Sequence, residues 1–299
     1  MTPTLALKVD VASYRGTRDG VPRLLEILSR CGIRATFYFS LGPDTTGKAL
    51  RRIFTRPGFL RQLARSRGPF GTGFTSLLYG ILLPPPMIGA SQAEVLREAA
   101  HQGHEVGIHA WDPVKWEDLL PWLPKRVALL ELGRASALFE EIFGRRCTTT
   151  AAPGWIVTPD ALEIQDALQL DFCSDTRGSF PFYPVMGGRR FRTLQIPTTL
   201  PPLDELLGAA GSTSANVHDR MLERLRPGLN VHTVRAELEG MSLAASFGGF
   251  LERLQEQGCR FLTLGQAAAE ARQSAPPDAA VVLGEVPGRP GSVARQVPQ

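Results

Sequence analysis

The sequence predicts a parallel α/β fold, either a barrel or an open sheet, and three observations support this class. Short apolar runs rich in β-branched residues alternate with amphipathic stretches about seven times over roughly 265 residues. The composition, 43% hydrophobic and 21% charged residues in a chain of 299, is typical of a globular protein and excludes a wholly disordered chain. The longest apolar stretch, 74–89, contains three consecutive prolines, so we expect no transmembrane helix.

The apolar runs predict seven strands, in the order 5–11, 35–40, 105–109, 147–151, 194–196, 229–234 and 261–264. Between the first two strands, apolar residues from Val21 to Leu28 form one helical stripe, and Cys31-Gly32 then ends the helix. The other predicted helices span 92–102, 125–143, 159–168, 217–225 and 243–257. In parallel α/β folds the functional groups lie at the carboxyl ends of the strands, so the search for a site begins there.

The two ends of the chain and its cysteines give three further expectations. From about residue 271 the sequence becomes rich in Pro, Gly, Ala, Ser and Val without periodicity, which predicts a domain over 1–270 and a flexible tail over 271–299. The first residues lack the pattern of a signal peptide, so we expect a cytoplasmic location. The four cysteines lie far apart without a CxxC pair, which favours reduced, buried thiols over a disulfide or zinc framework.

An insertion over about 45–90 interrupts the alternation. It contains no Asp or Glu between Thr45 and Ala93, and seven Lys and Arg residues fall within 48–67. An apolar run follows from Phe74 to Ile88, a combination that favours an interfacial contact with an anionic membrane, on the cytoplasmic face of the inner membrane. The residues we assign to that contact are Arg52, Arg56, Phe74, Leu77, Leu78 and Tyr79. The alternative is a solvated basic helix followed by a packed loop. Nucleic acid is not favoured, because aromatic residues do not alternate with the basic ones.

Polar residues follow several of the predicted strands, where they could converge on one site. They are Asp10 after the first strand, His109 at the end of the third, Trp155 in Ala-Pro-Gly-Trp, Asp175 and Arg177 in Ser-Asp-Thr-Arg-Gly, and Arg235 with Glu237 after 229–234. Each has a simpler explanation when taken alone. A lone Asp can cap a turn, a lone His can be structural, and Asp175 with Arg177 can form a loop ion pair.

The order of these motifs resembles the polysaccharide deacetylase family, with its NodB-homology fold, over residues 5–268. The motifs are VDVASYRGTRDGVPRLLEIL, FSLGPDTTGK, EVLREAAHQGHEVGIHAWD, AAPGW, SDTRG, QIPTTLP and AELEG. They are most similar to the branch that deformylates 4-deoxy-4-formamido-L-arabinose on undecaprenyl phosphate, in lipid A modification. The resemblance implies a distorted (β/α)7 barrel with a groove at the carboxyl ends of its strands, and a lipid-linked sugar phosphate as partner.

The resemblance also implies amide hydrolysis with a divalent metal (Zn, Co or Mn), held by one Asp and two His, a carboxylate base and a His acid. Asp10 stands at the base position and His109 at one metal-ligand position. Ala12 and Pro113 stand where the other two ligands are expected, and Arg235 replaces the acid. A methyl group and a proline ring cannot coordinate a metal, and a guanidinium stays protonated near pH 7.

Two functions follow from these replacements. The first is a member of the family that has lost metal-dependent hydrolysis and keeps sugar-lipid binding, with no metal bound and with Trp155, Asp175, Arg177 and Glu237 lining its pocket. The second is an active deformylase or deacetylase whose metal site is rebuilt from Asp10 and His109 with Asp112 or Asp175. His104 precedes its strand and His232 faces away from Arg235, so neither is expected to contribute. A third possibility is a related deacetylase that acts on an unrelated amide without contacting a membrane.

Overall fold

The computed structural model describes residues 3–59, 75–207 and 209–297. Its main sheet contains eight strands, which pair in parallel wherever they meet. In spatial order they are β10 (Arg260–Leu262), β1 (Pro3–Val11), β2 (Thr36–Ser40), β3 (Glu105–Ala110), β4 (Thr149–Thr150), β5 (Phe172–Cys173) and β8 (Leu194–Gln195), while β9 (Gly228–Arg235) pairs with β1.

The sheet curves into a barrel that is incompletely closed. Within the described ranges no ladder joins β8 to β9, and the gap is bridged by single contacts such as the Leu200 N–H donating to Val231 O at 3.1 Å. The predicted parallel barrel is therefore confirmed, and β5, a buried pair of residues, is the barrel strand that the sequence patterns missed.

The central strand β1 is apolar on both faces because both are covered. Leu5, Leu7 and Val9 belong to one buried cluster, and Ala6 belongs to another on the opposite face. This pattern is typical of parallel strands between layers. Register with β9 and β2 places Asp10 beside both Arg235 and Tyr38, so the carboxyl end of β1 brings polar groups together.

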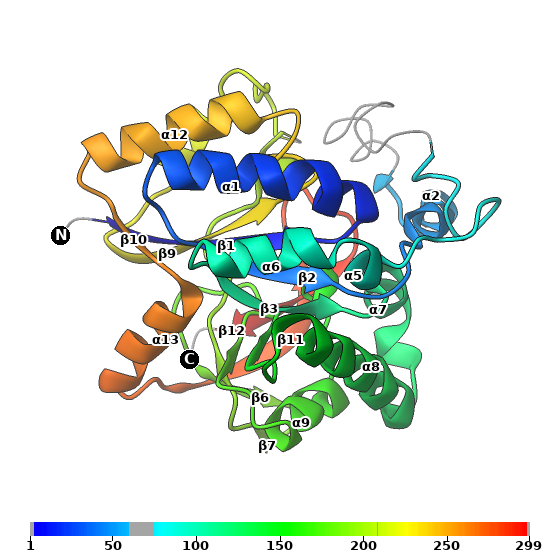
Figure 1. Ribbon diagram of the computed structural model, residues 1–299. Helices are drawn as coiled ribbons and strands as arrows, with labels where there is room; N and C mark the ends of the chain where they lie inside the picture. Colours follow the sequence, from blue (N-terminus) through cyan, green and yellow to red (C-terminus); the bar gives the residue numbers. More distant parts are fainter. Residues whose placement is uncertain (1–2, 60–74, 208, 298–299) are drawn as a thin grey trace.

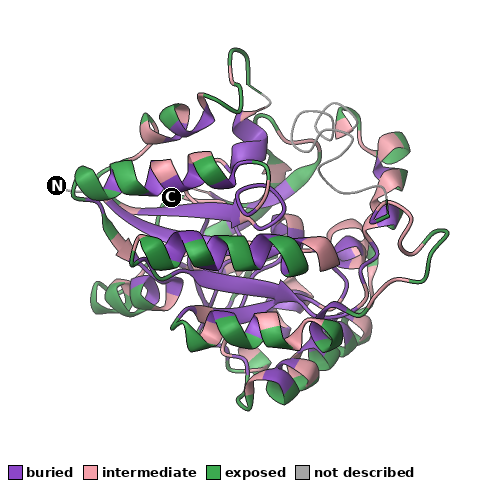
Figure 2. Cartoon of the chain, turned by 45° about the horizontal axis from the view of Figure 1, so that its top comes forward, coloured by how far each residue is buried: buried purple, intermediate pink, exposed green. Residues whose placement is uncertain are grey.

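Helices surround the sheet, with their apolar faces turned inward and their polar faces exposed (Figures 1 and 2). The longer ones are α1 (Val21–Arg30), α6 (Ala93–His101), α8 (Lys125–Phe143), α9 (Pro159–Ala167), α12 (Ala244–Glu256) and α13 (Leu264–Gln273). Short turns and helices connect them: η1 (Gly16–Gly20), α7 (Pro113–Leu119), η3 (Leu120–Trp122), η4 (Pro153–Trp155), α10 (Leu203–Leu206) and α11 (Val217–Leu222). The helix predicted over 125–143 has the observed bounds of α8.

The prediction of a flexible tail over 271–299 is wrong for most of its length. Helix α13 continues to Gln273, and β11 (Asp278–Glu285) and β12 (Ser292–Val297) form an antiparallel hairpin. The hairpin joins β6 (Tyr183–Met186) and β7 (Arg189–Arg190) in a second sheet. Its Pro residues and all its Gly residues except Gly284 lie in the turn at 286–291, whereas Ala279, Val281, Val293 and Ala294 are buried in the strands. The prediction failed because it relied on composition, in which the many turn residues obscured the apolar residues of two short strands.

The described parts of the insertion are short helices and turns. They comprise η2 (Thr46–Arg51), α2 (Arg52–Thr55), the turns over 75–83 and α5 (Ile88–Ser91). The segment starts and ends at the barrel, where the Ile88 N–H donates to Gly42 O. Among the described helices none is long and apolar enough to cross a membrane. All four cysteines are free thiols, as predicted; Cys147, Cys173 and Cys259 are buried, and Cys31 is partly exposed.

Candidate functional site

A small cavity of about 100 Å³ lies at the carboxyl ends of β1, β3 and β9. Most of the predicted catalytic, metal-ligand and substrate-binding residues line it, together with Arg52 of the insertion and with residues that the sequence did not single out. The lining residues include Asp10, Ala12, His109, Pro113, Trp155, Arg235 and Glu237 from the predicted set, and Arg52, Glu117 and Arg289 in addition. Parallel strands thus bring together residues more than 200 positions apart in the chain.

Asp10 lies in a charged environment at the end of β1. Its Oδ2 is 3.5 Å from the fully buried Nζ of Lys8, which also donates to Ser174 O at 3.0 Å. Burial lowers the pKa of Lys8, although the carboxylates of Asp10 and Asp175 favour its charged form. The Oδ1 of Asp10 is buried without a hydrogen-bond partner among the described residues. Asp10 therefore offers one acceptor atom to a group that enters the cavity.

His109 is held in a single tautomer. Its Nδ1 is 2.7 Å from Ala151 O, and because a carbonyl can only accept, Nδ1 carries the proton. Burial lowers the pKa of His109, while the nearby Asp10 opposes this change. The ring is therefore neutral near pH 7, with Nε2 left as an acceptor.

Arg235 is a fixed cation at the centre of the site. Its Nε is 3.3 Å from Asp204 Oδ1. Burial disfavours its charge, but the carboxylates of Asp204, Asp10 and Glu117 together raise its pKa above the ordinary value for arginine. Arg235 stays protonated at any pH in which the protein is folded, so it cannot donate a proton as an acid.

Four cationic groups surround the ring of Trp155. Their distances from the ring centroid are 5.2 Å for Lys8, 5.0 Å for Arg177, 5.9 Å for Arg235 and 5.0 Å for Arg289. The ring is buried, and its Nε1 donates to Thr198 Oγ1 at 3.0 Å. Trp155 has a φ of 56°, an unusual left-handed conformation for a large residue, which the surrounding contacts hold in place.

Two predicted binding residues, Asp175 and Arg177, are not among the residues that line the cavity. Asp175 accepts hydrogen bonds from the Ala152 N–H and from the amides of Gln165 and Gln195, so it anchors the loop that leads to Trp155. Burial raises the pKa of Asp175. Arg177 forms an ion pair with Glu205 at 2.7 Å. Arg177 also lies over the ring of Trp155, whereas Asp175 holds the backbone that precedes it.

Glu237 reaches the cavity but also has a structural role. It accepts hydrogen bonds from the backbone N–H groups of Ala12 and Ser13 and from Ser13 Oγ, at 3.1, 2.9 and 2.7 Å. These bonds fix the loop that follows β1.

The side chains at the implied metal position do not supply one Asp and two His. Ala12 and Pro113 line the cavity without a ligand atom, which leaves His109 as the sole side chain of the implied set. Asp112, a candidate replacement, caps α7 through Lys115 N and accepts from Thr45 Oγ1. In the part of the chain that the structure describes, no group of three or more His, Cys, Asp or Glu side chains is placed to hold a metal ion.

The remaining histidines that bear on a replacement site lie away from the cavity, as expected. His104 accepts from the Ala35 N–H near the start of β2, and His232 lies 3.4 Å from Glu239 and close to Phe250 of α12.

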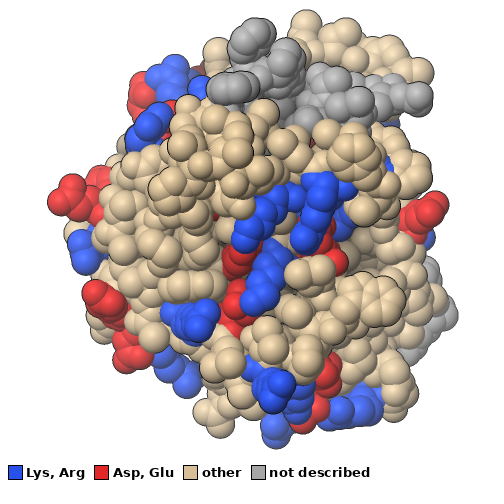
Figure 3. Space-filling view, turned by 90° about the vertical axis from the view of Figure 1, so that its right-hand side faces the viewer, with Lys and Arg blue, Asp and Glu red and all other residues tan. Residues whose placement is uncertain are grey.

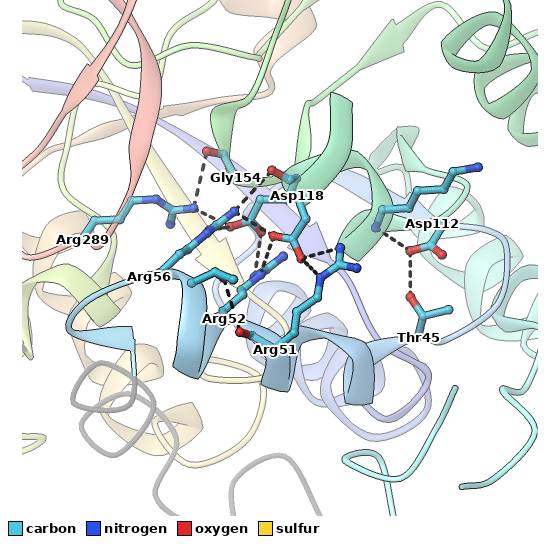
Figure 4. Close-up of polar contacts among 11 residues, drawn as sticks. Thr45, Arg51, Arg52, Arg56, Asp112, Asp118, Gly154 and Arg289 are labelled. Atoms are coloured by element: carbon cyan, nitrogen blue, oxygen red, sulfur yellow. Dashed lines mark hydrogen bonds and ion pairs between the residues drawn. The ribbon is translucent and has the colours of Figure 1, made fainter. Parts of the chain in front are cut away.

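An arginine cluster borders the cavity, formed by Arg51, Arg52, Arg56 and Arg289 around Glu117 and Asp118 (Figure 4). Figure 3 shows Lys and Arg side chains grouped around acidic ones near the middle of this face. Burial disfavours the charge of Glu117, but its arginine partners hold its pKa far below the usual range.

Arg52 and Arg56, which the sequence pattern assigned to a membrane contact, have ion-pair partners within the protein. Arg52 is only 8% exposed, and both residues are bound by carboxylates from α7. The sequence could not reveal these pairs, because the acidic partners lie more than 60 residues away. Arg289 was missed because it lies in the segment predicted to be a tail.

The apolar part of the insertion is exposed at positions other than those predicted. Leu77, Leu78 and Tyr79 are partly buried, and Phe74 lies outside the described residues. Ile81 and Leu82 are 54% and 76% exposed, and Phe54 of α2 is 90% exposed.

A parallel barrel with Asp10, His109 and a buried Trp155 at its carboxyl ends is the arrangement that the resemblance to polysaccharide deacetylases implies. A solved structure from Mycobacterium smegmatis, described as a polysaccharide deacetylase, has the same fold, with a TM-score of 0.64 at 16% identity over 96% of each chain. The chain belongs to the polysaccharide deacetylase family, whose model matches residues 2–173.

Curated relatives are similar over most of their length. A protein from Shewanella sediminis (strain HAW-EB3), named a probable 4-deoxy-4-formamido-L-arabinose-phosphoundecaprenol deformylase, is 35% identical over 87% of this chain and 84% of its own. A protein of the same name from Wigglesworthia glossinidia brevipalpis is 30% identical over 94% and 98%.

The fold is also shared with a pseudoenzyme. The wild-type CE4 family pseudoenzyme BA3943 of Bacillus anthracis has a TM-score of 0.53 at 15% identity, over 89% of this chain and 66% of its own. A mutant of that protein is described as having restored enzymatic activity.

Proposed function

We propose that this protein binds a lipid-linked sugar phosphate at the cavity and does not carry out metal-dependent hydrolysis of the sugar amide. The observation that carries the proposal is the position of Arg235. Its guanidinium lies beside Asp10, where the resemblance implies an acid that can exchange a proton. A permanent cation at that place can bind an oxygen atom but cannot protonate a leaving amine.

The absence of ligand atoms at Ala12 and Pro113 supports the same proposal. A catalytic metal usually has about three protein ligands, and a single imidazole binds a divalent metal only weakly. The side chains that remain can still recognise a sugar. Asp10 Oδ1 and His109 Nε2 accept hydrogen bonds, and Arg235 donates them, so hydroxyl or amide groups would find partners of both kinds.

The size of the cavity limits what enters it. A volume of about 100 Å³ accommodates one substituent of a sugar rather than a whole ring with its carrier. The rest of the ligand would extend over the mouth of the cavity. The exposed residues Phe54, Ile81 and Leu82 lie on the neighbouring insertion, and they would bring this mouth to a membrane that carries the lipid. The location that we propose is the cytoplasmic face of the membrane.

Metal binding tests the proposal directly. Metal-stripped protein is titrated with Zn²⁺, Co²⁺ and Mn²⁺ by calorimetry, and its metal content is checked by elemental analysis. We expect no stoichiometric binding and no release of formate or acetate from amide-bearing sugars. One equivalent bound at micromolar affinity or tighter, together with hydrolysis, would instead establish an active deformylase or deacetylase with a rebuilt site.

A variant that restores the residues implied by the resemblance provides the matched control. The triple variant Ala12→Asp, Pro113→His, Arg235→His restores the implied ligands and acid, so it should bind one equivalent of metal. If the triple variant takes up no metal while it remains folded, the alignment of these positions with the family is wrong, and the proposal loses its basis.

A further inference from the structure

The arginine cluster carries more positive charge than its carboxylates neutralise. Four guanidinium groups, those of Arg51, Arg52, Arg56 and Arg289, share the two carboxylates of Glu117 and Asp118. Asp204 and Glu205, two further carboxylates near Arg289, pair with Arg235 and Arg177. Asp10 is 3.5 Å from Lys8, and Glu237 accepts from the backbone of Ala12 and Ser13. Among the described residues of the cluster itself, guanidinium groups therefore outnumber carboxylates by two.

One buried donor of the cluster has no hydrogen-bond partner among the residues that the structure describes. Arg52 lines the cavity and is 8% exposed; its Nε bonds Asp118 at 2.7 Å and its Nη1 lies 3.2 Å from Glu117. Its Nη2 is buried and makes no hydrogen bond within residues 3–59, 75–207 and 209–297. A buried N–H group normally has a partner, so an unused guanidinium donor at a cavity indicates a ligand acceptor.

Arg289 is held less closely than the other arginines of the cluster. It is almost completely buried, yet its Nη2 makes only long contacts, at 3.3 Å to Glu117 and 3.4 Å to Gly154 O. Burial lowers its pKa despite the carboxylates around it. An additional anion beside Arg289 would relieve this unfavourable burial.

We infer that the arginine cluster binds the phosphate group of an ester that places one substituent in the adjacent cavity. A phosphate group matches both features, because its charge offsets the excess and its several oxygen atoms accept from more than one guanidinium. The identity of the ester as a sugar phosphate rests on the proposed function, whereas the phosphate site rests on the cluster itself. The same chemistry could come from inorganic phosphate or from a phospholipid headgroup, which the experiment below separates.

The test removes the excess charge without removing the buried donor. The double variant Arg51→Gln, Arg56→Gln leaves Arg52 and Arg289 for the two carboxylates, and the replaced side chains are 44% and 21% exposed. The control variant Arg23→Gln, Arg253→Gln loses the same charge from exposed ion pairs on α1 and α12. Circular dichroism and thermal unfolding establish that all three proteins are folded.

Calorimetry then measures binding of a soluble pentose 1-phosphate, the free pentose and inorganic phosphate. We expect the wild type and the control to bind the sugar phosphate, and the double variant to bind it at least tenfold more weakly. Equal affinity in the double variant, or no phosphate contribution in the wild type, would overturn the inference. If the free pentose binds as tightly as the pentose 1-phosphate, the proposed function stands, but the arginine cluster is not a phosphate site. Binding of inorganic phosphate as tight as that of the sugar phosphate would keep the arginine site and remove the sugar from the proposed function.

Vesicles distinguish the last source. Vesicles of phosphatidylcholine with phosphatidic acid, and vesicles of phosphatidylcholine alone, are each tested as competitors of the sugar phosphate for the wild type. If only the vesicles with phosphatidic acid compete, the phosphate comes from a headgroup, and the assignment to a sugar ester is wrong. No competition is expected.

Discussion

At the scale of single residues, the site is a set of buried charges that need one another. Arg235 stays cationic because Asp204, Asp10 and Glu117 lie around it, and Glu117 stays ionised because arginines surround it. Taking one partner from such a group leaves an uncompensated buried charge, which costs more than a surface ion pair contributes. The neighbouring carboxylates therefore stabilise the charge of Arg235 at the position where the resemblance implies a proton-exchanging group.

Two buried histidines make the stability of the protein depend on pH. Burial lowers the pKa values of His104 and His218 to about 4. An unfolded histidine has a pKa near 6.5, so below that pH the unfolded chain binds protons that the native protein does not. Stability is therefore lost as the pH falls from about 6.5 towards about 4, by roughly 1 to 2 kcal/mol for each histidine between pH 7 and pH 5.

Urea unfolding at pH 7 and pH 5 measures this loss. The variant His218→Leu should lose about 1 to 2 kcal/mol less than the wild type over that range. His101→Gln, at an exposed position on α6, serves as the control and should behave like the wild type. If His218→Leu loses as much unfolding free energy as the wild type between pH 7 and pH 5, the native pKa of His218 is not lowered by burial.

At the scale of elements, the β11–β12 hairpin forms one wall of the site, although the sequence did not predict it. Gln296 of β12 accepts from the Ser179 N–H and donates to Phe180 O, which fastens the hairpin to the barrel. The turn between the strands then carries Arg289 to Trp155 and Glu117. This turn is tight at Gly288, which has a φ of 83°.

Gly288→Ala should loosen this turn. A Cβ at Gly288 would lie 2.8 Å from Glu205 O, in addition to the strain of a positive φ. Gly188→Ala is a matched control, because its φ is 75° and nothing lies within 4 Å of its added Cβ. We expect Gly288→Ala to be about 1 to 3 kcal/mol less stable than Gly188→Ala in urea unfolding. Equal losses in the two variants would mean that the contact with Glu205 is easily relieved.

The elements differ in how far sequence patterns predict them. Long periodic stretches such as α8, and the buried strand β1, follow from local pattern because one face or both faces must be apolar. Strands β11 and β12 did not, because their short apolar alternation is separated by a turn rich in Pro and Gly. Asp10, His109 and Arg235 were placed together from motif order, but the arginine cluster depends on pairing between distant segments, which no local pattern encodes.

At the scale of the whole molecule, exposed apolar residues, the arginine cluster and the cavity belong to one region. Arg51 ends η2, Arg52 begins α2, and Phe54 lies in the same helix. Ile81 and Leu82 lie in a turn of the same insertion. Isolated exposed apolar residues are common on protein surfaces, but here they lie close in the chain to the basic residues.

Vesicle sedimentation tests the membrane contact. The variant Phe54→Ser, Ile81→Ser, Leu82→Ser should lose binding to anionic vesicles, because three exposed apolar side chains leave the interface. Trp122→Ser removes a side chain that is 83% exposed in η3, outside the insertion, and should bind as the wild type does. No binding by the wild type would remove the membrane from the proposed function.

The order of the site residues along the chain also affects how the protein is made. Asp10 belongs to the first strand synthesised, whereas its neighbour Arg235 and the wall residue Arg289 are added more than 200 residues later. Contacts between such distant segments form slowly. During synthesis, part of the edge of β1 must therefore stay unpaired until β9 and β10 emerge, and the cavity has no complete wall until 278–297 has left the ribosome.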